Sequence, residues 1–409
     1  MAASPARCAA FDILLRTERD GAHSDTLLHS GHMSGLSRGE RAFVTEAVLG
    51  CLRRQGEIDH LVGRAARRAP TRIDPEVLVA LRVGAYQLRH MRGIPDHAAV
   101  SQAVDLVKRA RKRSAAGFAN AVLRRLPPKP AAGDAVALNH PEWLTRRWAT
   151  NLGRRRCARL LEANLRKPET YFRIPAPTDV GPILTRLRHA GLEVMATCLP
   201  RAYQLTRGNV PSAIAAAGSR LWFRDLNSQR VAALLAGHGS STVLDVCAAP
   251  GGKSRQLAEE APVVAADRRA ARMRMMRRLG RSGIDLVVLN AEISLPFRRT
   301  FSRVLVDVPC SGTGTLSRNP EIKWRLRPTD LADLQRRQSR ILDNSLNAVA
   351  AGGLAVYATC SLEPEENEHV VRAAVSRRTG WTARKAISSV PGSDPGDGFQ
   401  AWTIRRPAD

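Results

Sequence analysis

Two cysteines of this chain each follow a short apolar run, and a thiol in such a place can act as a nucleophile. Cys310 ends the run "VLVDVPC", and Cys360 ends the run "LAVYATC". The reactive form is the thiolate, and a loop that leads from a strand towards a helix N-terminus can lower a cysteine pKa from its ordinary value of about 8.5. An isolated cysteine is more often a small buried apolar residue. Two of them at the ends of neighbouring strands favour a catalytic pair.

A second candidate site lies in the loop "AAPGGKS", residues 248–254, which follows the apolar run "TVLDVC". Glycines at a strand-to-helix turn let the backbone approach a ligand closely, and the next helix start offers unpaired N–H groups. The following apolar run, "APVVAAD", ends in Asp267, a position from which a carboxylate can bind ribose hydroxyls. Asp267 taken alone could equally well cap a helix. Together with the loop it predicts a site for a nucleoside-like ligand.

Two phosphate-binding patterns fit this loop poorly. Gly252, Lys253 and Ser254 match the end of a P-loop, but the first glycine of that pattern would fall on Cys247. The dinucleotide pattern G-x-G-x-x-G is not met either. An ATPase based on "GGKS" is therefore a distant alternative. For Lys253 a solvated position at a helix start is the simple structural alternative, as a helix cap is for Asp307.

The elements that must position these residues are short runs that are apolar throughout. Runs of this type are strands buried on both faces of a parallel sheet, and they read "STVLDVC", "APVVAAD", "IDLVVLN", "SRVLVDV" and "GLAVYATC". Between the last two of these runs, apolar residues recur at helical spacing, which predicts a helix there; they are Leu331, Leu334, Ile341, Leu342, Leu346 and Val349. Residues 226–409 are therefore predicted to form a Rossmann-like, doubly wound α/β domain. Its ligands should bind outside the carboxyl ends of the strands, where both cysteines are expected.

The rest of the chain divides at a proline-rich linker. Apolar residues recur at helical spacing through residues 5–126, and no β-rich run interrupts them. The stretch "LPPKPAAGD", 126–134, cannot continue a helix. After it we expect helices at "PEWLTRRWATNLG" and "VGPILTRLRHAG" and a strand at "TYFRIPA". The chain is thus predicted to be multidomain, with an all-helical domain at 1–130, a linker and small α+β module at 131–225, and the α/β domain at 226–409.

The charge of the chain indicates a polyanionic partner. Lysine and arginine together number 64 against 37 aspartates and glutamates, which gives a formal net charge of +27 over 409 residues. Genomic base composition could explain arginine in place of lysine, but not the size of this excess. Nucleic acid is therefore favoured. An anionic membrane is the rival partner, but it would require a concentrated basic amphipathic segment, whereas the arginines here are spread along the whole chain.

The sequence lacks the signals of a membrane-bound or secreted protein, and we expect a cytoplasmic protein. No run approaches the roughly 18 apolar residues of a membrane span. The stretch "MAASPARCAAFDILLRTERD" has too short an apolar run for a secretory signal, although a mitochondrial presequence stays a minor alternative. The cysteines number 7, are widely spread and form no C-x-x-C pair, which disfavours disulfides and a zinc site. No metal is expected.

Three motifs in order carry a family resemblance. "LDVCAAPGGKS", "VDVPCSGTGTLSRNPEIKWR" and "YATCSLEPEENE" resemble the RNA 5-methylcytosine methyltransferases of the NOL1/NOP2/Sun family. The likeness spans residues 222–405, from "RDLNSQ" ahead of the first strand to "GDGFQAWTIRR" at the end. The stretches "ARCAAFDILLRTERDGAHSDTLL", "RAFVTEAVLGCLRRQGEIDHLV" and "FANAVLRRL" look like a NusB-type helical RNA-binding domain. The combination resembles the bacterial members of the family that act on small-subunit ribosomal RNA.

The resemblance implies that S-adenosylmethionine is the cofactor. The family pattern places its methionine and ribose part on the loop residues Cys247, Ala248, Ala249, Pro250, Gly251, Gly252 and Lys253. Asp267 would bind the ribose, and Asp307 belongs to both the cofactor and the catalytic set. The position that usually holds an aspartate for the adenine amine is Asn290 here. Its amide oxygen can still accept that hydrogen bond.

The resemblance also implies why two cysteines are needed. Carbon 5 of cytosine is too weak a nucleophile to take a methyl group unaided, and a thiolate that adds to carbon 6 activates it. The family gives this attack to Cys360 and the release of the product to Cys310, while Asp307 forms a hydrogen bond near ring nitrogen 3. The stretch "PEENE", 364–368, reads as the acid-rich first turn of a helix. The family motif implies that it supports the loop of Cys360.

The sequence thus predicts an S-adenosylmethionine-dependent RNA cytosine-5 methyltransferase that acts on small-subunit ribosomal RNA. We expect a monomer whose partner is RNA, with no DNA and no membrane. A non-catalytic RNA-binding or antitermination-like factor that uses the NusB-like domain is the alternative, and Cys310, Cys360 and Asp307 together oppose it. The helical domain is expected to add RNA affinity, while the chemistry resides in the C-terminal domain.

Overall fold

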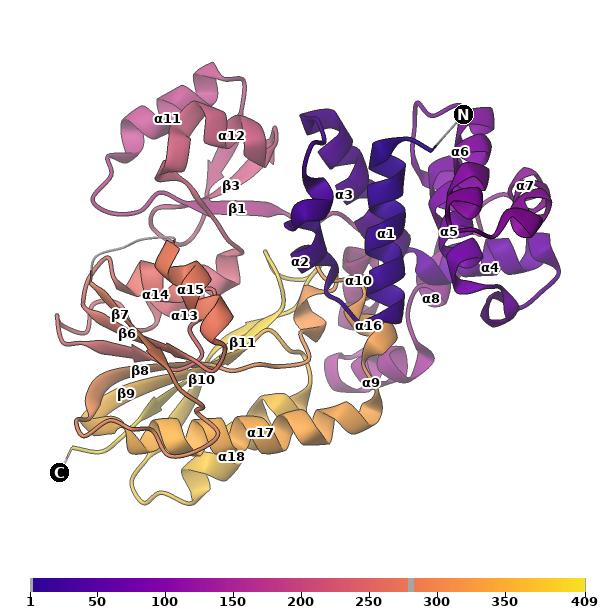
Figure 1. Ribbon diagram of the computed structural model, residues 1–409. Helices are drawn as coiled ribbons and strands as arrows, with labels where there is room; N and C mark the ends of the chain where they lie inside the picture. Colours follow the sequence, from indigo (N-terminus) through magenta and orange to yellow (C-terminus); the bar gives the residue numbers. More distant parts are fainter. Residues whose placement is uncertain (1–2, 279–282, 409) are drawn as a thin grey trace. The chain divides into compact units, whose positions relative to one another are not determined.

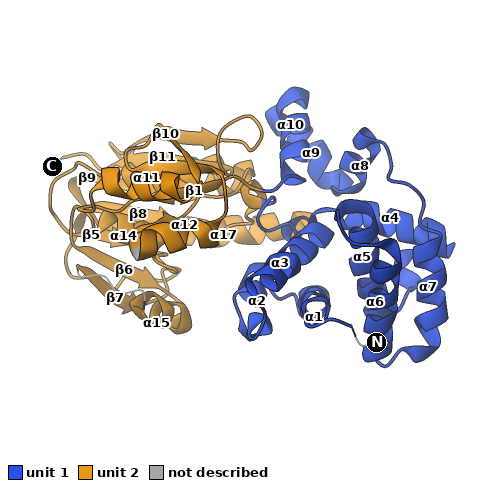
Figure 2. Cartoon of the chain, turned by 90° about the horizontal axis from the view of Figure 1, so that it is seen from above, with its two compact units in different colours: residues 1–167, 316–325 blue, residues 168–315, 326–409 orange. Residues whose placement is uncertain are grey.

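The computed structural model describes residues 3–278 and 283–408 of the chain. It divides into two compact units, shown in different colours in Figure 2, of which the first comprises residues 1–167 and 316–325. The second comprises residues 168–315 and 326–409. These limits differ from the sequence boundaries at 130/131 and 225/226, and the three-domain division stays a prediction.

All the secondary-structure elements assigned in the described part of the first unit are helices, which confirms the prediction from the helical spacing of its apolar residues. Its α-helices are α1 (Pro5–Arg19), α2 (Ser24–Leu28), α3 (Arg38–Arg53), α4 (Gln55–Ala66), α5 (Pro75–His90), α6 (Asp96–Arg109), α7 (Ala116–Arg124), α8 (Ala132–Leu138), α9 (Glu142–Leu152), α10 (Arg154–Asn164) and α16 (Ile322–Arg325). Helix α9 is the one expected at "PEWLTRRWATNLG". None of the helices in the described part of the chain is long and apolar enough to cross a membrane.

Helix α5 forms the centre of this unit, and its residues 77–87 are all buried. Its start is fixed by Asp74, whose carboxylate accepts a hydrogen bond from the backbone N–H of Glu76, and by a proline at the first helical position. Gly84 lets its neighbours approach closely, because a Cβ atom there would lie 2.9 Å from the Cβ atom of Ala103 in α6 and from a methyl carbon of Leu123 in α7. Helices α1–α7 thus share one apolar core.

The second unit contains a small α+β module, as predicted. Its four strands are antiparallel in the order β2-β3-β1-β4. Its elements are β1 (Thr170–Arg173), α11 (Val180–His189), β2 (Glu193–Ala196), β3 (Ala202–Arg207), α12 (Val210–Ala217) and β4 (Trp222–Phe223). Strand β1 and helix α11 are those expected at "TYFRIPA" and "VGPILTRLRHAG". Apolar side chains of both helices pack on the sheet.

A seven-stranded sheet forms the rest of this unit, in the order β10-β11-β9-β8-β5-β6-β7. The five apolar runs are its parallel strands, so the predicted Rossmann-like sheet is confirmed. They are β5 (Val243–Asp245), β6 (Val263–Asp267), β7 (Ile284–Val288), β8 (Phe301–Asp307) and β9 (Val349–Thr359). Two further strands extend the sheet: β11 (Phe399–Arg405) pairs antiparallel with β9, and β10 (Thr382–Ser389) pairs antiparallel with β11.

Helices cover both faces of this sheet (Figure 1). Val304 and Val306 of β8 pack with one set, α17 (Pro328–Asn347) and α18 (Glu368–Ser376). Leu305 packs with the other set, α13 (Leu226–Ala233), α14 (Gly252–Leu257) and α15 (Ala270–Arg278). The expected helix before the last parallel strand was placed too long, since Val349 is already the first residue of β9 and pairs with Phe301.

Candidate active site

The register of two neighbouring strands brings Cys310 and Cys360 together. Strands β8 and β9 are parallel and pair Asp307 with Ala358, so that the two following loops leave the sheet side by side. The Sγ atoms of Cys310 and Cys360 are 3.3 Å apart, a distance at which one thiol donates a hydrogen bond to the other. Both side chains are partly exposed. The two cysteines that the sequence singled out thus lie in one place.

A buried carboxylate joins the two cysteine loops. Glu366 is fully buried and accepts hydrogen bonds from the backbone N–H of Ser311 at 2.8 Å and from the hydroxyls of Ser311 and Ser361. The side-chain amide of Gln338 in α17 donates to the same carboxylate at 2.9 Å. Burial raises the pKa of Glu366, while these donors oppose the shift. Because Ser311 follows Cys310 and Ser361 follows Cys360, one side chain fixes both loops.

The backbones of these loops also lie unusually close together. The N–H of Gly314 donates to the carbonyl of Cys360 at 2.9 Å, and the N–H of Gly398 donates to the carbonyl of Gly314 at 2.8 Å. A Cβ atom on Gly314 would come within 2.2 Å of the carbonyl oxygen of Gly398, which no side chain could tolerate. The glycines of "SGTGT" therefore allow three segments to meet at the site.

The thiol of Cys310 is held in its protonated form. The hydrogen bond with Cys360, together with burial, raises the pKa of Cys310 well above its ordinary value. A protonated thiol beside a second sulfur can donate its hydrogen to that sulfur. The pair is therefore arranged so that Cys310 is the donor when Cys360 carries negative charge.

Asp307 and Lys253 form an ion pair at the end of β8. The ammonium Nζ atom lies 2.5 Å from Oδ2 of the carboxylate. Lys253 is buried, which excludes the solvated helix start considered as its alternative, and its ammonium also lies 5.5 Å from the ring centroid of Phe399. The Asp307 side chain keeps 26% of its surface exposed. The side chain therefore stays partly open to solvent at the strand end that leads into the Cys310 loop.

The loop expected to hold the cofactor connects β5 to α14. The N–H of Ala248 donates to the carbonyl of Ala266 in β6, which anchors the loop on the next strand. Gly251 has a positive φ of 96°, and a Cβ atom there would lie 2.6 Å from the side chain of Met276. Burial raises the pKa of Cys247, so this third cysteine at the sheet edge stays a neutral thiol. The backbone shape of the loop thus depends on glycine.

The two other polar residues predicted for the cofactor end the next strands of the sheet. Asp267 ends β6, and its carboxylate accepts hydrogen bonds from the N–H groups of Ala249 at 3.3 Å and Arg269 at 2.8 Å. Asn290 follows β7, and its side-chain oxygen accepts from the N–H of Glu292 at 3.1 Å. Both side chains are partly exposed. Asp267 therefore holds its own turn and the loop in place while it still faces solvent.

Sequence reasoning missed Asp245, the last residue of β5. Its side chain is buried, and its Oδ2 atom accepts a hydrogen bond from the hydroxyl of Ser254 at 2.6 Å. Its Oδ1 atom has no partner in the described structure. Burial raises its pKa to about 6. An acid inside an otherwise apolar run was the signal that could have identified it.

These features fit a nucleoside-like cofactor. The glycine-shaped loop, Asp267 and Asn290 end three adjacent strands at the carboxyl edge of the sheet. An unpartnered buried acceptor such as Oδ1 of Asp245 is suited to a ligand that carries N–H or O–H donors. The sites for chemistry and for the cofactor meet at Lys253, which lies in the loop and pairs with Asp307.

Comparisons with known proteins match both parts of the chain. The family model "16S rRNA methyltransferase RsmB/F" matches residues 232–404, and the model of the NusB family matches residues 4–127. The probable ribosomal RNA small subunit methyltransferase B of Bacillus subtilis is 31% identical, over 90% of this chain and 87% of that protein. The ribosomal RNA small subunit methyltransferase B of Citrobacter koseri is 32% identical, over 89% of this chain and 90% of its own length.

Solved structures share the fold. That of the protein PH0851 covers 99% of this chain and 100% of its own, with a TM-score of 0.81 at 21% identity. A methyltransferase homologue from Pyrococcus horikoshii covers 67% of this chain and 98% of its own, with a TM-score of 0.58 at 24% identity. Methyltransferases of the matched family use S-adenosylmethionine, the cofactor that the sequence predicts. The chain therefore belongs to the RsmB/F family of ribosomal RNA methyltransferases and carries a NusB-type domain ahead of its methyltransferase domain.

Proposed function

We propose that the chain methylates carbon 5 of a cytosine in small-subunit ribosomal RNA through a covalent bond between a cysteine and carbon 6. The observation that supports this most directly is the 3.3 Å separation of the Cys310 and Cys360 sulfurs, beside the carboxylate of Asp307. A methyltransferase that used an exocyclic amine or a ribose hydroxyl as its acceptor would need no thiol pair. The protein acts on RNA in the cytoplasm as a monomer.

Cys360 is the attacking sulfur in this proposal. Its bond to carbon 6 moves the ring electrons towards carbon 5, which becomes able to take a methyl group. The thiol of Cys310 can donate a hydrogen bond to the Cys360 sulfur and so stabilise it as a thiolate before attack. S-adenosylmethionine would be held by the 247–253 loop, Asp267 and Asn290, and it would supply the methyl group.

Asp307 has the task of stabilising the ring while its electrons shift. Negative charge develops near ring nitrogen 3, and a proton passed from the Lys253 ammonium to the Asp307 carboxylate would let this carboxyl group donate a hydrogen bond there. Lys253, which is 2.5 Å from Asp307, holds the side chain in position and can share a proton with it. The ion pair therefore acts on the cytosine through Asp307 and borders the cofactor through Lys253.

Cys310 serves the release of the product. Once the Cys360 sulfur is bonded to carbon 6, it no longer acts on Cys310 as a hydrogen-bond partner and a negative charge, so the largest cause of the raised Cys310 pKa is removed and burial remains. Cys310 can then lose its proton to solvent, and its thiolate can accept the proton of carbon 5. The electrons of that C–H bond restore the ring double bond, the bond from sulfur to carbon 6 breaks, and its electron pair returns to Cys360.

The first test is the product. Purified full-length protein, unmodified small-subunit ribosomal RNA and S-adenosylmethionine are incubated, and the digested RNA is analysed by mass spectrometry. We expect 5-methylcytidine, which bisulfite sequencing then places at one position. Methylation on another atom would refute the cytosine-5 assignment, while the rRNA methyltransferase family would stand.

The second test separates the two cysteines by step. Cys360→Ala should form neither product nor adduct, because carbon 6 is never attacked. Cys310→Ala should attack and methylate, then remain bonded to the RNA as an adduct that survives denaturing gels. Cys198→Ala, which removes an exposed thiol outside the site, is the matched control and should behave like the unmodified protein. An adduct with Cys360→Ala in place of Cys310→Ala would reverse the roles.

A further inference from the structure

Residues 316–325, "LSRNPEIKWR", follow the Cys310 loop in sequence but belong to the helical unit in the structure (Figure 2). We call this segment the strap. It leaves the α/β unit after Thr315 and returns to it at residue 326. Helix α16 (Ile322–Arg325) forms its last turn. The family motif that includes Cys310 is thus divided between the two units.

A buried carboxylate fixes the strap at the start of α2. Glu321 has 2% of its surface exposed, and its two oxygens accept hydrogen bonds from the N–H of Ser24 at 3.1 Å and the hydroxyl of Ser24 at 2.9 Å. Ser24 is itself fully buried. Hydrogen bonds to a buried carboxylate are the stronger kind, because the acceptor is charged and water does not compete.

Two neighbouring side chains bind the C-terminal end of α3. Lys323 has 1% of its surface exposed and donates from Nζ to the carbonyl of Arg53 at 2.9 Å, while the indole N–H of Trp324 donates to the carbonyl of Leu52 at 3.1 Å. Arg53 donates in return from Nε to the carbonyl of Ser317 at 2.9 Å. Burial lowers the pKa of Lys323 to about 7. The last carbonyls of a helix lack hydrogen-bond donors within the helix, and Lys323 and Trp324 provide donors for two of them.

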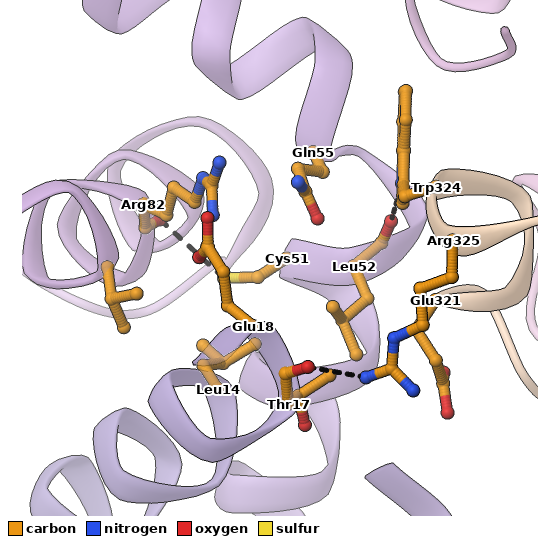
Figure 3. A pocket seen from close by; sticks show the side chains of 11 residues that line it. Leu14, Thr17, Glu18, Cys51, Leu52, Gln55, Arg82, Glu321, Trp324 and Arg325 are labelled. Atoms are coloured by element: carbon orange, nitrogen blue, oxygen red, sulfur yellow. Dashed lines mark hydrogen bonds and ion pairs between the residues drawn. The ribbon is translucent and has the colours of Figure 1, made fainter. Parts of the chain in front are cut away.

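Arg325 binds the end of α1 in the same way, as Figure 3 shows for its bond to Thr17. Its guanidinium donates to the carbonyls of Thr17 at 2.5 Å, Gly21 at 2.9 Å and Ala22 at 2.7 Å. A cavity of about 210 Å³ lies beside these bonds. The strap is therefore held by hydrogen bonds to helix ends as well as by packing, so that loss of one anchoring side chain should loosen it.

The strap is directly joined to the catalytic loop. Only residues 311–315 separate Cys310 from its first residue, and the N–H of Gly314 in this stretch bonds to the carbonyl of Cys360 at 2.9 Å. Each residue spans at most about 3.6 Å, so a short connection transmits a shift of the strap to the loop. We propose that the strap lets the helical unit position the Cys310 loop, with Glu321 as a positioning residue for the release step.

This inference rests on the proposed function, because it assigns the strap to the step that Cys310 performs. It also changes the role expected for the helical domain. That domain contributes to turnover through the strap as well as binding RNA. Removal of residues 1–126 would leave Glu321, Lys323 and Trp324 without the partners that bury them, so the chemistry should not survive that truncation intact.

The test uses the full chain with Glu321→Ala and, as a milder variant that should still fold, Ser24→Ala. We expect kcat for RNA methylation to fall by about 10- to 100-fold in Glu321→Ala, since small misplacements of a reacting group have effects of this size. The KM for RNA and the binding of S-adenosylmethionine should stay within about twofold, and the protein–RNA adduct should accumulate. Glu321→Gln, which keeps an acceptor for Ser24, should recover part of kcat.

The matched control is Glu142→Ala, which removes a glutamate of the same unit whose side chain is 75% exposed. It should leave kcat unchanged. Amide hydrogen exchange at Gly314 gives a readout that is independent of the reaction, and exchange should become faster in Glu321→Ala and Ser24→Ala only. If Gly314 exchange and kcat stay unchanged, or if only RNA affinity falls, the strap proposal is wrong. Absence of 5-methylcytidine with faster Gly314 exchange would instead refute the proposed function and leave the coupling standing.

Discussion

At the scale of single residues, Asp245 is an acid in a place that disfavours its charge. It is 1% exposed at the end of β5, and the hydroxyl of Ser254 is the one donor to its carboxylate among the described residues. Burial raises its pKa from 3.8 to about 6, although the hydrogen bond from Ser254 opposes the shift. A side chain with this property lowers stability at neutral pH, so its presence below the cofactor loop is consistent with a role in ligand binding.

The raised pKa predicts a pH dependence of stability. The folded state holds the Asp245 proton more tightly than the unfolded state, so its favourable contribution is complete below pH 3.8 and is lost as the pH rises through about 6. Asp245→Asn removes this dependence and should be more stable than the unmodified protein at pH 8, by about 3 kcal/mol at most. Calorimetric melting between pH 4.5 and about 8 measures the difference, which should grow with pH.

The control for this experiment is Asp333→Asn, which changes an aspartate of α17 whose side chain is 72% exposed. Its melting temperature should follow that of the unmodified protein at every pH. A constant difference between Asp245→Asn and the unmodified protein across the range would mean that Asp245 is not the group that titrates.

At the scale of elements, the short helix η6 (Pro364–Glu366) determines how the two cysteine strands end. Glu366→Ala would leave the N–H of Ser311 buried without an acceptor, at about 1–3 kcal/mol, while the amide of Gln338 would lose one of its two acceptors and keep the carbonyl of Pro309. We expect a lower melting temperature and a loss of both methylation and adduct, with S-adenosylmethionine binding retained. Glu368→Ala in the same motif, where the side chain is 48% exposed, is the control. Normal adduct formation in Glu366→Ala would show that the cysteines hold their positions without it.

The parallel strands could be predicted because burial on both faces gives an apolar run. Their ends are where the sequence analysis placed both cysteines, the loop expected to hold the cofactor, and Asp267. The outer strands, β10 and β11, could not be predicted in this way. Most of β10 is exposed, and its pattern "TARKAISS" is set by pairing with β11 and by solvent on its free side. The residues alone gave Glu366 no role, because an acid-rich turn reads as solvated unless its distant partners in α17 and the Cys310 loop are known. Only the family motif implied that "PEENE" supports the loop of Cys360.

The strap shows a stronger limit of sequence reasoning. Its residues lie between β8 and α17 and have a helical, charged composition, so local pattern assigns them to the α/β domain. Their partners are the ends of α1, α2 and α3, which lie about 270–310 residues away in sequence. Neither the spacing of apolar residues nor the turn-forming residues could predict these contacts, because hydrogen bonds to helix ends leave no pattern in the sequence of the strap.

At the scale of the whole molecule, the net charge of +27 should govern how RNA binds. Each phosphate contact with a single strand adds about −0.7 to the slope of log affinity against log salt, so about five contacts predict a 100-fold weaker Kd at 200 mM than at 50 mM KCl. Filter binding with the full chain and small-subunit ribosomal RNA measures this slope. S-adenosylmethionine offers no phosphate to the basic surface, so its Kd over the same range is the control and should change little. An RNA affinity that stays flat while salt rises would mean that shape or base contacts, and not the arginine excess, hold the substrate.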